Sequence, residues 1–319
     1  MPPCAPSCYA EVPPTLELAV LILSSPKNGV ARDAVRQAWA HAAPKSCPCE
    51  TRFWFVIGDT DRATRAEGDL LLVNAAEGYR NVTRKVIAAF RWLLDQSISV
   101  SYVFKTDDDA FVCTGGVMRM LRLHRPLYAG IVMPHQKVIT KPDHPWRDVA
   151  YSRTFHAGAQ GRYADYFQGA GYALRLALVR TVVRNADRLG IDTMEPPPSN
   201  EDAWVGALAR VRPTSAGEDS PGSAAVALAP NQSLELETPL PAAQWLRTSD
   251  NLTRICAAGY LLVHKLQPTD LLECARAAAA LPPFCQVRRY VNVHQQAAWR
   301  DHAPRSASGK LRCACLDVG

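Results

Sequence analysis

Apolar runs alternate with amphipathic or polar stretches along the first third of the chain. Each apolar run predicts a strand, and the runs occupy residues 18–24, 52–58, 69–74 and 101–105. The stretches between them predict helices over residues 30–41, in a polar piece after residue 58, and over residues 80–95. This βαβαβαβ order is typical of an α/β fold with a mostly parallel, doubly wound sheet flanked by helices. In such sheets, ligands bind beyond the carboxyl ends of the strands.

The pattern becomes less regular after residue 113. We expect a helix over residues 115–124 and a strand over 128–133, followed by a long polar stretch at 134–163. Polar connections of that length inside a compact domain are usually lids or binding loops. Two further helices are predicted over residues 174–189 and 201–211. The segment PPPSN lies between them and favours an extended turn.

Three consecutive carboxylates, Asp107, Asp108 and Asp109, follow the fourth apolar run in the segment YVFKTDDDAFV. Like charges repel at a partly buried strand end, so a cation is expected beside them. Three interpretations are open: an acidic first turn of the next helix, an aspartyl phosphotransfer site, and a divalent-cation site that holds the diphosphate of a nucleotide-sugar. The phosphotransfer site fits poorly, because Lys105 and Thr106 separate the apolar run from the carboxylates.

Composition narrows the possible classes of protein. Hydrophobic residues make up 48% and charged residues 21% of the chain, which indicates a folded globular protein rather than a disordered one. The net charge is +6, but no long run of like charges occurs, so we expect no nucleic-acid partner. The apolar stretch at residues 16–25 is too short to cross a bilayer and is better interpreted as a buried strand.

Ten cysteines are many for a cytosolic protein. Most of them form clusters, at Cys4/Cys8, Cys47/Cys49, Cys256/Cys274/Cys285 and Cys313/Cys315. Glycosylation sequons begin at Asn81, Asn231 and Asn251. Together these features favour an oxidising lumen, with reduced buried thiols as the alternative; a zinc site is less favoured because the Cys-x-Cys pairs lack the usual ligand spacing.

Several ordered motifs make the chain resemble one enzyme family. The motifs are SSPKNGVARDAVRQAW at 24–39, EGYRNVTRKVIAAFRW at 77–92, KTDDDAFV at 105–112, YFQGAGYAL at 166–174, EDAWVGALA at 201–209 and YLLVHK at 260–265. Their order is similar to that of the β1,3-glycosyltransferase family (GT31), which includes β1,3-galactosyltransferases, β1,3-N-acetylglucosaminyltransferases and fringe. KPDHPWR at 141–147 and the C-terminal motif most resemble the xylosylprotein galactosyltransferase type that builds the glycosaminoglycan linker.

The resemblance implies a GT-A (Rossmann-like) fold and an inverting, metal-dependent transfer, most simply of galactose from UDP-galactose to a glycan or glycoprotein acceptor. N-acetylglucosamine is the alternative donor sugar. A catalytically silent relative that binds glycans or chaperones a partner is the alternative class of function. None of Asp109, Asp202 and His264, whose loss would indicate such a relative, is missing.

The resemblance also implies roles for particular residues. Asp107, Asp109 and His264 are the expected metal ligands, with Mn²⁺ as the expected ion because oxygen ligands and one imidazole suit it. His294 in YVNVHQ is the rival to His264. Asp202 is the expected general base, and Glu201 is expected to orient it or to bind the acceptor.

Further residues are expected on the donor side. Lys85 is expected to stabilise the diphosphate, with Arg32 and Arg36 on the uridine or diphosphate side and Asp108, like Asp107, near the ribose or the metal's water shell. Gly169 and Gly171 are expected to let the backbone approach the donor closely. Candidates for stacking on sugar faces are Trp146, Tyr166 and Trp204, with a place in the core as the commoner alternative for aromatic residues.

The expected organisation is one catalytic domain with extensions. It consists of an N-terminal extension at 1–15, a GT-A domain at 16–275 with an insertion at 214–243 that is rich in Ser, Gly, Pro and Ala, and a Cys-containing extension at 276–319. Family members are usually type II membrane proteins of the Golgi, so a Golgi location and a membrane anchor are implied. Since no such anchor is recognised, we expect either the lumenal portion of such a protein, an incomplete sequence of it, or a soluble enzyme if the chain is complete.

Overall fold

The computed structural model describes residues 15–40, 51–96, 99–134, 136–144, 146–155, 161–211, 260–279 and 289–292. The chain divides into two compact units. The first draws on Met1–Arg32, Pro44–Asp108 and His124–Pro239, and the second on Asp33–Ala43, Asp109–Leu123 and Leu240–Gly319. The expected insertion at 214–243, most of the C-terminal extension and His294 lie outside the described residues.

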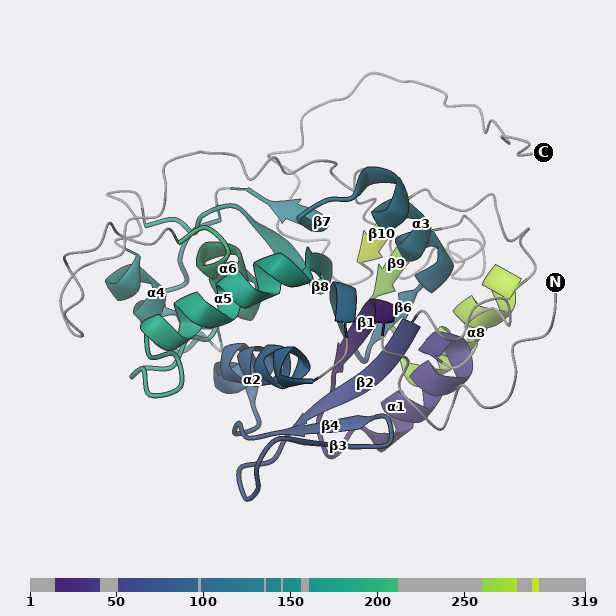
Figure 1. Ribbon diagram of the computed structural model, residues 1–319, viewed down its shortest axis with the longest axis horizontal. Coiled ribbons are helices and arrows are strands. Elements are labelled where there is room, and N and C mark those ends of the chain that lie inside the picture. Colours follow the sequence, from purple (N-terminus) through teal and green to yellow (C-terminus); the bar gives the residue numbers. More distant parts are fainter. Residues whose placement is uncertain are drawn as a thin grey trace. The chain divides into compact units, whose positions relative to one another are not determined.

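A seven-stranded sheet forms the centre of the first unit, in the order β3-β4-β2-β1-β5-β8-β7 (Figure 1). The strands are β1 (Thr15–Leu23), β2 (Thr51–Gly58), β3 (Arg65–Glu67), β4 (Leu70–Val73), β5 (Ser99–Asp107), β7 (Tyr128–Met133) and β8 (Tyr166–Arg175). β1 lies between β2 and β5 and is parallel to both, and β4 is parallel to β2. β3 and β8 pair antiparallel with their neighbours. The expected fold class, an α/β fold with a mostly parallel sheet flanked by helices, is therefore confirmed.

The helix expected after residue 58 is wrong, because the chain there contains β3. β3 forms a short antiparallel hairpin with β4. Gly68 between the two strands has a φ of 66°, a conformation that glycine adopts readily. Arg65 on β3 pairs with Asp59 and Glu67 at 2.8 and 2.7 Å, which holds polar side chains along this edge strand.

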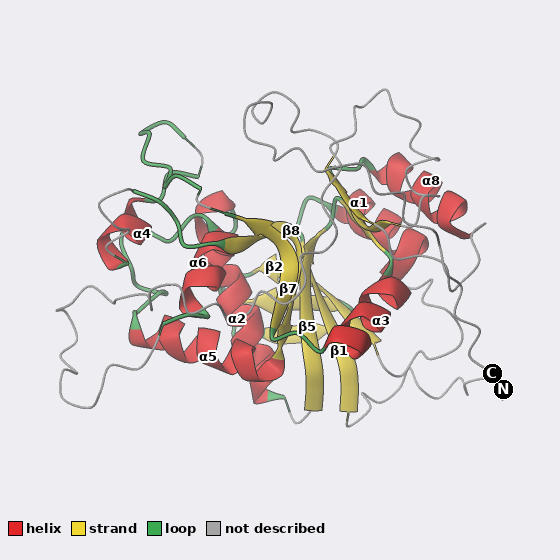
Figure 2. Ribbon diagram, turned by 90° about the horizontal axis from the view of Figure 1, so that it is seen from above, coloured by secondary structure: helices red, strands yellow, loops and turns green. Residues whose placement is uncertain are grey.

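Three helices pack against one another on this sheet: α2 (Val82–Asp95), α5 (Leu176–Arg188) and α6 (Glu201–Leu208) (Figure 2). A short 3₁₀ helix, η3 (Tyr79–Asn81), precedes α2. α2 buries Val86, Phe90 and Leu93 at helical spacing. This spacing produces the amphipathic pattern from which the sequence predicts the helix. α6 instead buries most of its side chains, because it contacts α2, α5 and β8 at once.

The polar stretch at 134–163 is not wholly irregular, since it contains α4 (Val149–Thr154). The side chain of Asp148 caps this helix by accepting a hydrogen bond from the Tyr151 backbone N–H at 3.2 Å. Six residues are too few to show a helical period, so the sequence pattern did not reveal α4.

The second unit contains a three-stranded sheet in the order β10-β9-β6. The strands are β6 (Ala110–Val112), β9 (Tyr260–His264) and β10 (Arg289–Asn292), and β9 runs antiparallel to β6 so that His264 pairs with Ala110. Its helices are α8 (Pro268–Ala279), the π-helical turn η2 (Arg36–Ala40) that continues α1 (Gly29–Val35), and α3 (Thr114–His124). The Trp39 indole N–H donates to the Ala110 carbonyl at 2.8 Å and joins η2 to β6.

Within the described part of the chain, the helices are too short or too polar to cross a membrane.

Candidate functional site

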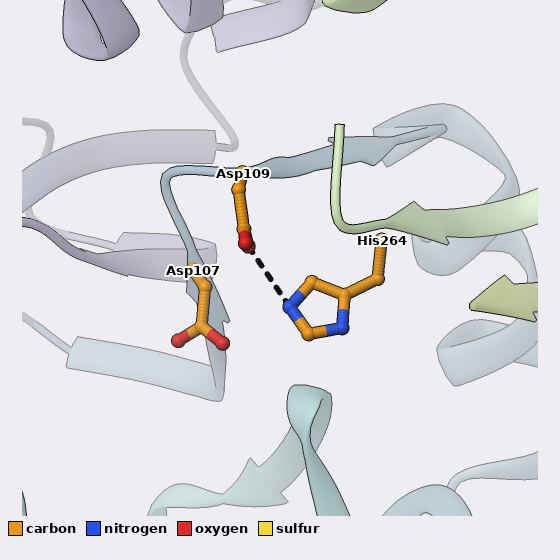
Figure 3. Close-up of side chains that lie close together, drawn as sticks. All are labelled: Asp107, Asp109 and His264. Atoms are coloured by element: carbon orange, nitrogen blue, oxygen red, sulfur yellow. Dashed lines mark ion pairs between the residues drawn. The ribbon is translucent and has the colours of Figure 1, made fainter. Parts of the chain in front are cut away.

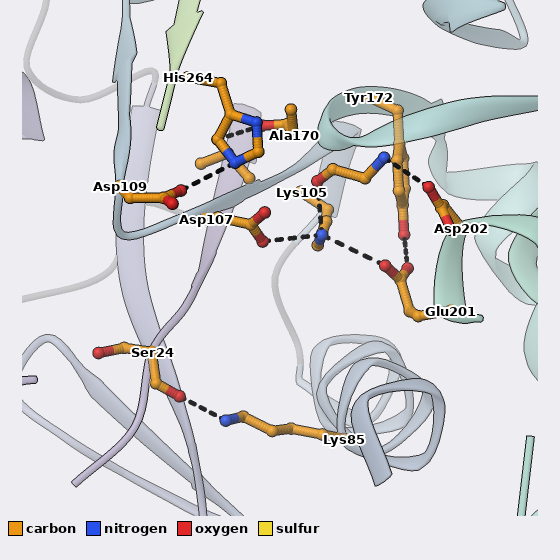
Figure 4. A network of polar contacts seen from close by, with 12 residues as sticks. Ser24, Lys85, Lys105, Asp107, Asp109, Ala170, Tyr172, Glu201, Asp202 and His264 are labelled. Carbon is orange, nitrogen blue, oxygen red and sulfur yellow. Dashed lines mark hydrogen bonds and ion pairs between the residues drawn. The ribbon is translucent and has the colours of Figure 1, made fainter. Parts of the chain in front are cut away.

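A buried lysine lies at the carboxyl end of β5. Lys105 is only 2% exposed, and it directly follows the buried residues Tyr102, Val103 and Phe104 of the same strand. Its ammonium lies 3.0 Å from Asp107 Oδ1 and 3.2 Å from Glu201 Oε2, and it donates to the Gly169 carbonyl at 2.5 Å (Figure 4). One cation therefore connects three elements, β5, β8 and α6.

Two adjacent carboxylates begin α6, and their surroundings differ. Glu201 is buried and accepts a hydrogen bond from the Tyr172 hydroxyl in addition to its ion pair with Lys105. Asp202 is partly exposed, and its Oδ2 accepts the Gly169 backbone N–H at 2.8 Å. Glu201 is thus fixed by a phenol and an ammonium, whereas the two oxygens of Asp202 accept the backbone N–H groups of Gly169 and Ala203.

The ionisation of this group follows from burial and charge. Burial and the neighbouring charge of Glu201 raise the pKa of Asp202 to about 7, although Lys105 acts in the opposite direction. Burial also raises the pKa of Glu201, and the charge of Lys105 offsets only part of that rise. For Lys105, burial lowers the pKa, but the charges of Asp107 and Glu201 outweigh it, so the pKa of the ammonium lies above its usual value.

The three consecutive carboxylates have three different environments. Asp107 ends β5 and pairs with Lys105. Asp108 is buried and accepts hydrogen bonds from Ser24 Oγ at 2.7 Å and Asn28 Nδ2 at 2.9 Å, so it is tied to the turn after β1. Asp109 is the first residue of the next segment and belongs to the second unit.

Asp109 pairs with His264, which the strand pairing of β6 with β9 brings beside it. His264 Nε2 lies 2.9 Å from Asp109 Oδ1 (Figure 3). Lys265 Nζ lies 3.1 Å from Asp109 Oδ2. The Leu266 backbone N–H donates to the Asp109 carbonyl at 2.9 Å and fixes the turn after β9. His264 is only 5% exposed.

The donor set suits a divalent metal ion. Asp107, Asp109 and His264 each offer one ligand atom, and these atoms lie within 4.8 Å of one another. Two carboxylates and one imidazole form a mixed oxygen and nitrogen set that Mn²⁺ accepts. The residues expected to hold the ion therefore fit it, and the rival His294 lies outside the described residues.

Two of the expected donor-side cations gather at the end of β1. Arg32 donates to Ser24 Oγ at 3.1 Å and to the Ser25 carbonyl. Lys85 is buried, donates to the Ser24 carbonyl and pairs with Glu77 at 2.8 Å. Burial lowers the pKa of Lys85, which Glu77 opposes. The ammonium of Lys85 therefore fixes the strand end.

Arg36, the third expected cation, pairs with Asp33 at 2.6 Å, one turn earlier on the same helical segment. Both residues belong to the second unit. The role of Arg36 on the donor side stays a prediction.

Gly169 stands where a side chain would fill the space between the ionised groups. A Cβ added there would lie 3.2 Å from Lys105 Nζ and 3.4 Å from Asp202 Oδ2. Gly171 pairs with Thr106 in the register of β8 against β5. At Gly169 the backbone approaches the protein's own charged groups, and the expected close approach of Gly169 and Gly171 to the donor stays a prediction.

The aromatic candidates have different surroundings. Trp204 is fully buried and Tyr166 is 6% exposed, and their rings pack in a cluster with Tyr151, Phe155 and Tyr163. The two are core residues, so the expectation that they stack on a sugar is wrong for them. Trp146 is 43% exposed and stays a candidate.

A buried carboxylate joins this aromatic cluster. Asp148 is fully buried, and its Oδ2 accepts the Trp204 indole N–H at 2.9 Å and the Tyr163 hydroxyl at 3.4 Å. Burial raises the pKa of Asp148 to about 6 in spite of these hydrogen bonds.

Sequence reasoning assigned no site role to Lys105, Tyr172 or Asp148. For Lys105 a signal was present, since a lysine that continues an apolar run needs a polar or charged partner if it is buried. For Tyr172 and Asp148 no local pattern marks the contact, because their partners come from α6, far away in the sequence.

Comparisons with known proteins agree on one family. The family model described as galactosyltransferase matches residues 30–212. Beta-1,3-galactosyltransferase 6 of Mus musculus is 33% identical over 178 residues, which is 51% of this chain and 52% of the relative. UDP-GlcNAc:betaGal beta-1,3-N-acetylglucosaminyltransferase 8 of Mus musculus is 28% identical over 284 residues, 83% of this chain and 63% of the relative.

The alignment with a third relative covers a larger share of that relative's length. Beta-1,3-galactosyltransferase 4 of Rattus norvegicus is 24% identical over 320 aligned residues, 88% of this chain and 78% of the relative. The chain spans 52% and 63% of the lengths of the first two relatives. The family match includes Lys105, the three aspartates and the start of α6, whereas His264 lies beyond its end.

Proposed function

Because the chain belongs to the galactosyltransferase family, whose model matches residues 30–212, we propose that it is an inverting, metal-dependent β1,3-glycosyltransferase. The proposed donor is UDP-galactose and the proposed acceptor is a glycan or glycoprotein. The observation that supports this most is the partly exposed Asp202, which is held by a backbone N–H beside a buried Lys105–Glu201 pair.

Asp202 is the proposed general base. An acceptor hydroxyl oxygen attacks the anomeric carbon, the bond from that carbon to the diphosphate breaks with its electron pair going to UDP, and the hydroxyl proton passes to Asp202. A carboxylate whose pKa is raised to about 7 is a better proton acceptor than an ordinary aspartate and is still substantially ionised at neutral pH. Asp202 must therefore be ionised before each transfer, so that it can accept the proton of the acceptor hydroxyl.

Glu201 is the proposed orienting group. Its oxygens are occupied by Tyr172 and Lys105, and its side chain is buried, so it is poorly placed to take a proton from an acceptor. This division assigns the two neighbouring carboxylates to different tasks.

Asp107, Asp109 and His264 are the proposed metal ligands, and Mn²⁺ is the proposed ion. When bound, the ion supplies positive charge for the diphosphate, whose charge increases in the transition state. Lys265 pairs with Asp109 and adds a further positive charge beside the carboxylate.

The donor side is assigned to groups near the ends of β1 and β8. Arg32, Arg36, Asp108, Gly169 and Gly171 are proposed to contact or shape the donor site. For Lys85 we propose an indirect role, because its ammonium binds the Ser24 carbonyl and Glu77 and so fixes the end of β1.

N-acetylglucosamine is the second candidate donor. The relative named UDP-GlcNAc:betaGal beta-1,3-N-acetylglucosaminyltransferase 8 aligns over 83% of this chain, a larger share than the 51% aligned with beta-1,3-galactosyltransferase 6. The choice of sugar therefore has to be measured.

A Golgi lumenal location and a glycoprotein acceptor are proposed because the family resemblance implies both. Cys274 on α8 is disulfide-bonded, which supports an oxidising compartment. The proposal includes no nucleic-acid partner.

The test is UDP release from a panel of UDP-sugars, with and without Mn²⁺, using β-xyloside, β-galactoside and α-N-acetylgalactosaminide acceptors. We expect Mn²⁺-dependent turnover of UDP-galactose, lost in Asp109→Ala. Faster turnover of UDP-N-acetylglucosamine would show that this nucleotide-sugar, and not UDP-galactose, is the donor. A folded protein that turns over no donor would exclude the transferase activity for this chain and favour a glycan-binding relative.

A further inference from the structure

Lys105 has contacts that the proposed reaction does not by itself require. Its ammonium is enclosed between Asp107, Glu201 and the Gly169 carbonyl, and it is too deeply buried to contact a substrate directly. A buried ammonium is costly unless it is paired, so this position needs all of its partners.

The glycine that binds Lys105 also binds the proposed base. The Gly169 carbonyl accepts from Lys105 at 2.5 Å, while the Gly169 N–H donates to Asp202 Oδ2 at 2.8 Å. The two groups of one residue therefore connect the lysine on β5 to the aspartate on α6. A change at Lys105 allows Gly169 to move, and with it the carboxylate that the Gly169 N–H holds.

Lys105 also fixes the residue next to the base. Glu201 Oε2 lies 3.2 Å from Lys105 Nζ, and Oε1 accepts from the Tyr172 hydroxyl. Since Glu201 and Asp202 are consecutive in α6, the lysine restrains the first turn of this helix from a second direction. Figure 4 shows this network, with Lys105 between Asp107 and Glu201.

We propose that Lys105 is a positioning residue for the base: it fixes Asp202 through the Gly169 peptide and through Glu201, and so determines the rate of the chemical step rather than donor binding. This inference rests on the proposed function for its kinetic consequence. The geometric part, that Lys105 holds the Gly169 peptide against Asp202, is independent of activity. A displacement of about 1 Å of a catalytic group is enough for a rate loss of roughly 100-fold.

The kinetic test compares Lys105→Met with the wild type. Because Lys105 also pairs with Asp107, a proposed metal ligand, the comparison is made at saturating Mn²⁺. We then expect kcat to fall about 100-fold while KM for the UDP-sugar stays within about threefold. Tyr172→Phe removes one hydrogen bond to Glu201 but leaves the Gly169 contacts, so its loss of kcat should be smaller. A kcat of Lys105→Met within threefold of the wild type, or a loss that appears only in donor KM, overturns the proposal.

Lys85→Met is the matched control for stability. Lys85 is also a buried lysine of the same unit, bound to a strand-end carbonyl and a glutamate. Comparable thermal midpoints for the two variants show that any difference in kinetics does not come from general destabilisation.

Hydrogen exchange at the Gly169 amide tests the geometry without any turnover. We expect this amide to exchange at least about tenfold faster in Lys105→Met, with the Ala173 amide of the same strand as the unchanged reference. Equal protection of Gly169 in both proteins contradicts the inference. If the wild type shows no transfer, the proposed function fails and the exchange result still decides the positioning role.

A second variant makes the test possible if Lys105→Met does not fold. Removing Lys105 leaves Glu201 buried without its cation, which is strongly destabilising. If Lys105→Met does not fold, the double variant Lys105→Met/Glu201→Gln removes both charges, and Gly169 exchange is measured there with the same expected increase.

Discussion

Asp202 and Glu201 are neighbours in the sequence, but their oxygens have different partners. Glu201 is enclosed by Lys105 and Tyr172, whereas Asp202 is partly exposed and rests on the Gly169 backbone N–H. At the scale of a residue, burial and hydrogen bonding therefore distinguish a group that orients from a group that accepts a proton.

The pH dependence of the reaction tests this assignment. The base must be ionised, and the pKa of Asp202 is raised to about 7, so kcat/KM should rise as pH increases through about 7 and fall about tenfold for each pH unit below it. The measurement is kcat/KM from pH 5.5 to 8.5 at constant ionic strength. An acid limb centred near pH 4 would mean that Asp202 is not the base.

Two variants act as controls for the pH profile. Asp202→Asn cannot accept the proton, so we expect a loss of at least about 100-fold at every pH. Asp143→Asn removes an exposed carboxylate of the same unit and should leave the profile unchanged.

At the scale of an element, Asp148 connects two helices. It caps α4 through the Tyr151 N–H and accepts the indole N–H of Trp204, which is on α6. Two groups therefore hold the start of α6. Lys105 pairs with Glu201, and Asp148 accepts the indole N–H of Trp204. A helix of eight residues needs such tertiary contacts, because short helices are marginal by themselves.

Asp148→Asn should destabilise the protein most at low pH. The amide replaces an acceptor facing the Trp204 donor, at an expected cost of about 1–3 kcal/mol. The pKa of Asp148 is raised to about 6 in the folded protein, so its stabilising contribution is fully present below about pH 4 and is lost as pH rises through about 6.

Urea unfolding at pH 4.5 and at pH 7.5 measures this difference. The gap in unfolding free energy between wild type and Asp148→Asn should shrink by about 2–3 kcal/mol at the higher pH, since one pKa unit corresponds to about 1.4 kcal/mol. A gap that is equal at both pH values would show that Asp148 does not titrate in this range.

At the scale of the whole molecule, folding brings Asp109, which directly precedes β6, beside His264 on β9, although the two segments are far apart in the sequence. A metal ion bound by such residues stabilises the folded chain, because the unfolded chain offers no preformed site. Thermal unfolding with and without Mn²⁺ should show an increase in the midpoint, equivalent to about 2.7 kcal/mol at 100 times the dissociation constant.

The increase in the thermal midpoint should disappear in Asp109→Ala and in His264→Ala and persist in Asp61→Asn, which removes an exposed carboxylate elsewhere. Retention of the full increase in His264→Ala would direct the search for the imidazole ligand to His294.

The sequence by itself determined the family and most of the strands and helices of the first unit. Apolar runs and helical spacing are local, so β1, β2, β4, β5 and α2 could be read from short windows. The resemblance to β1,3-glycosyltransferases was confirmed by the match over residues 30–212. The assignment of roles to individual site residues stays a prediction.

Only the tertiary structure decided how the charged groups divide their tasks. It placed Lys105 between Asp107 and Glu201, bound Lys85 to Glu77, and put Trp204 in the core. The helix expected after residue 58 became β3 because pairing with β4 outweighed a weak local preference. Local pattern encodes backbone and burial, whereas partners from distant segments, such as Glu201 for Lys105 and Asp148 for Trp204, are fixed only when the chain packs.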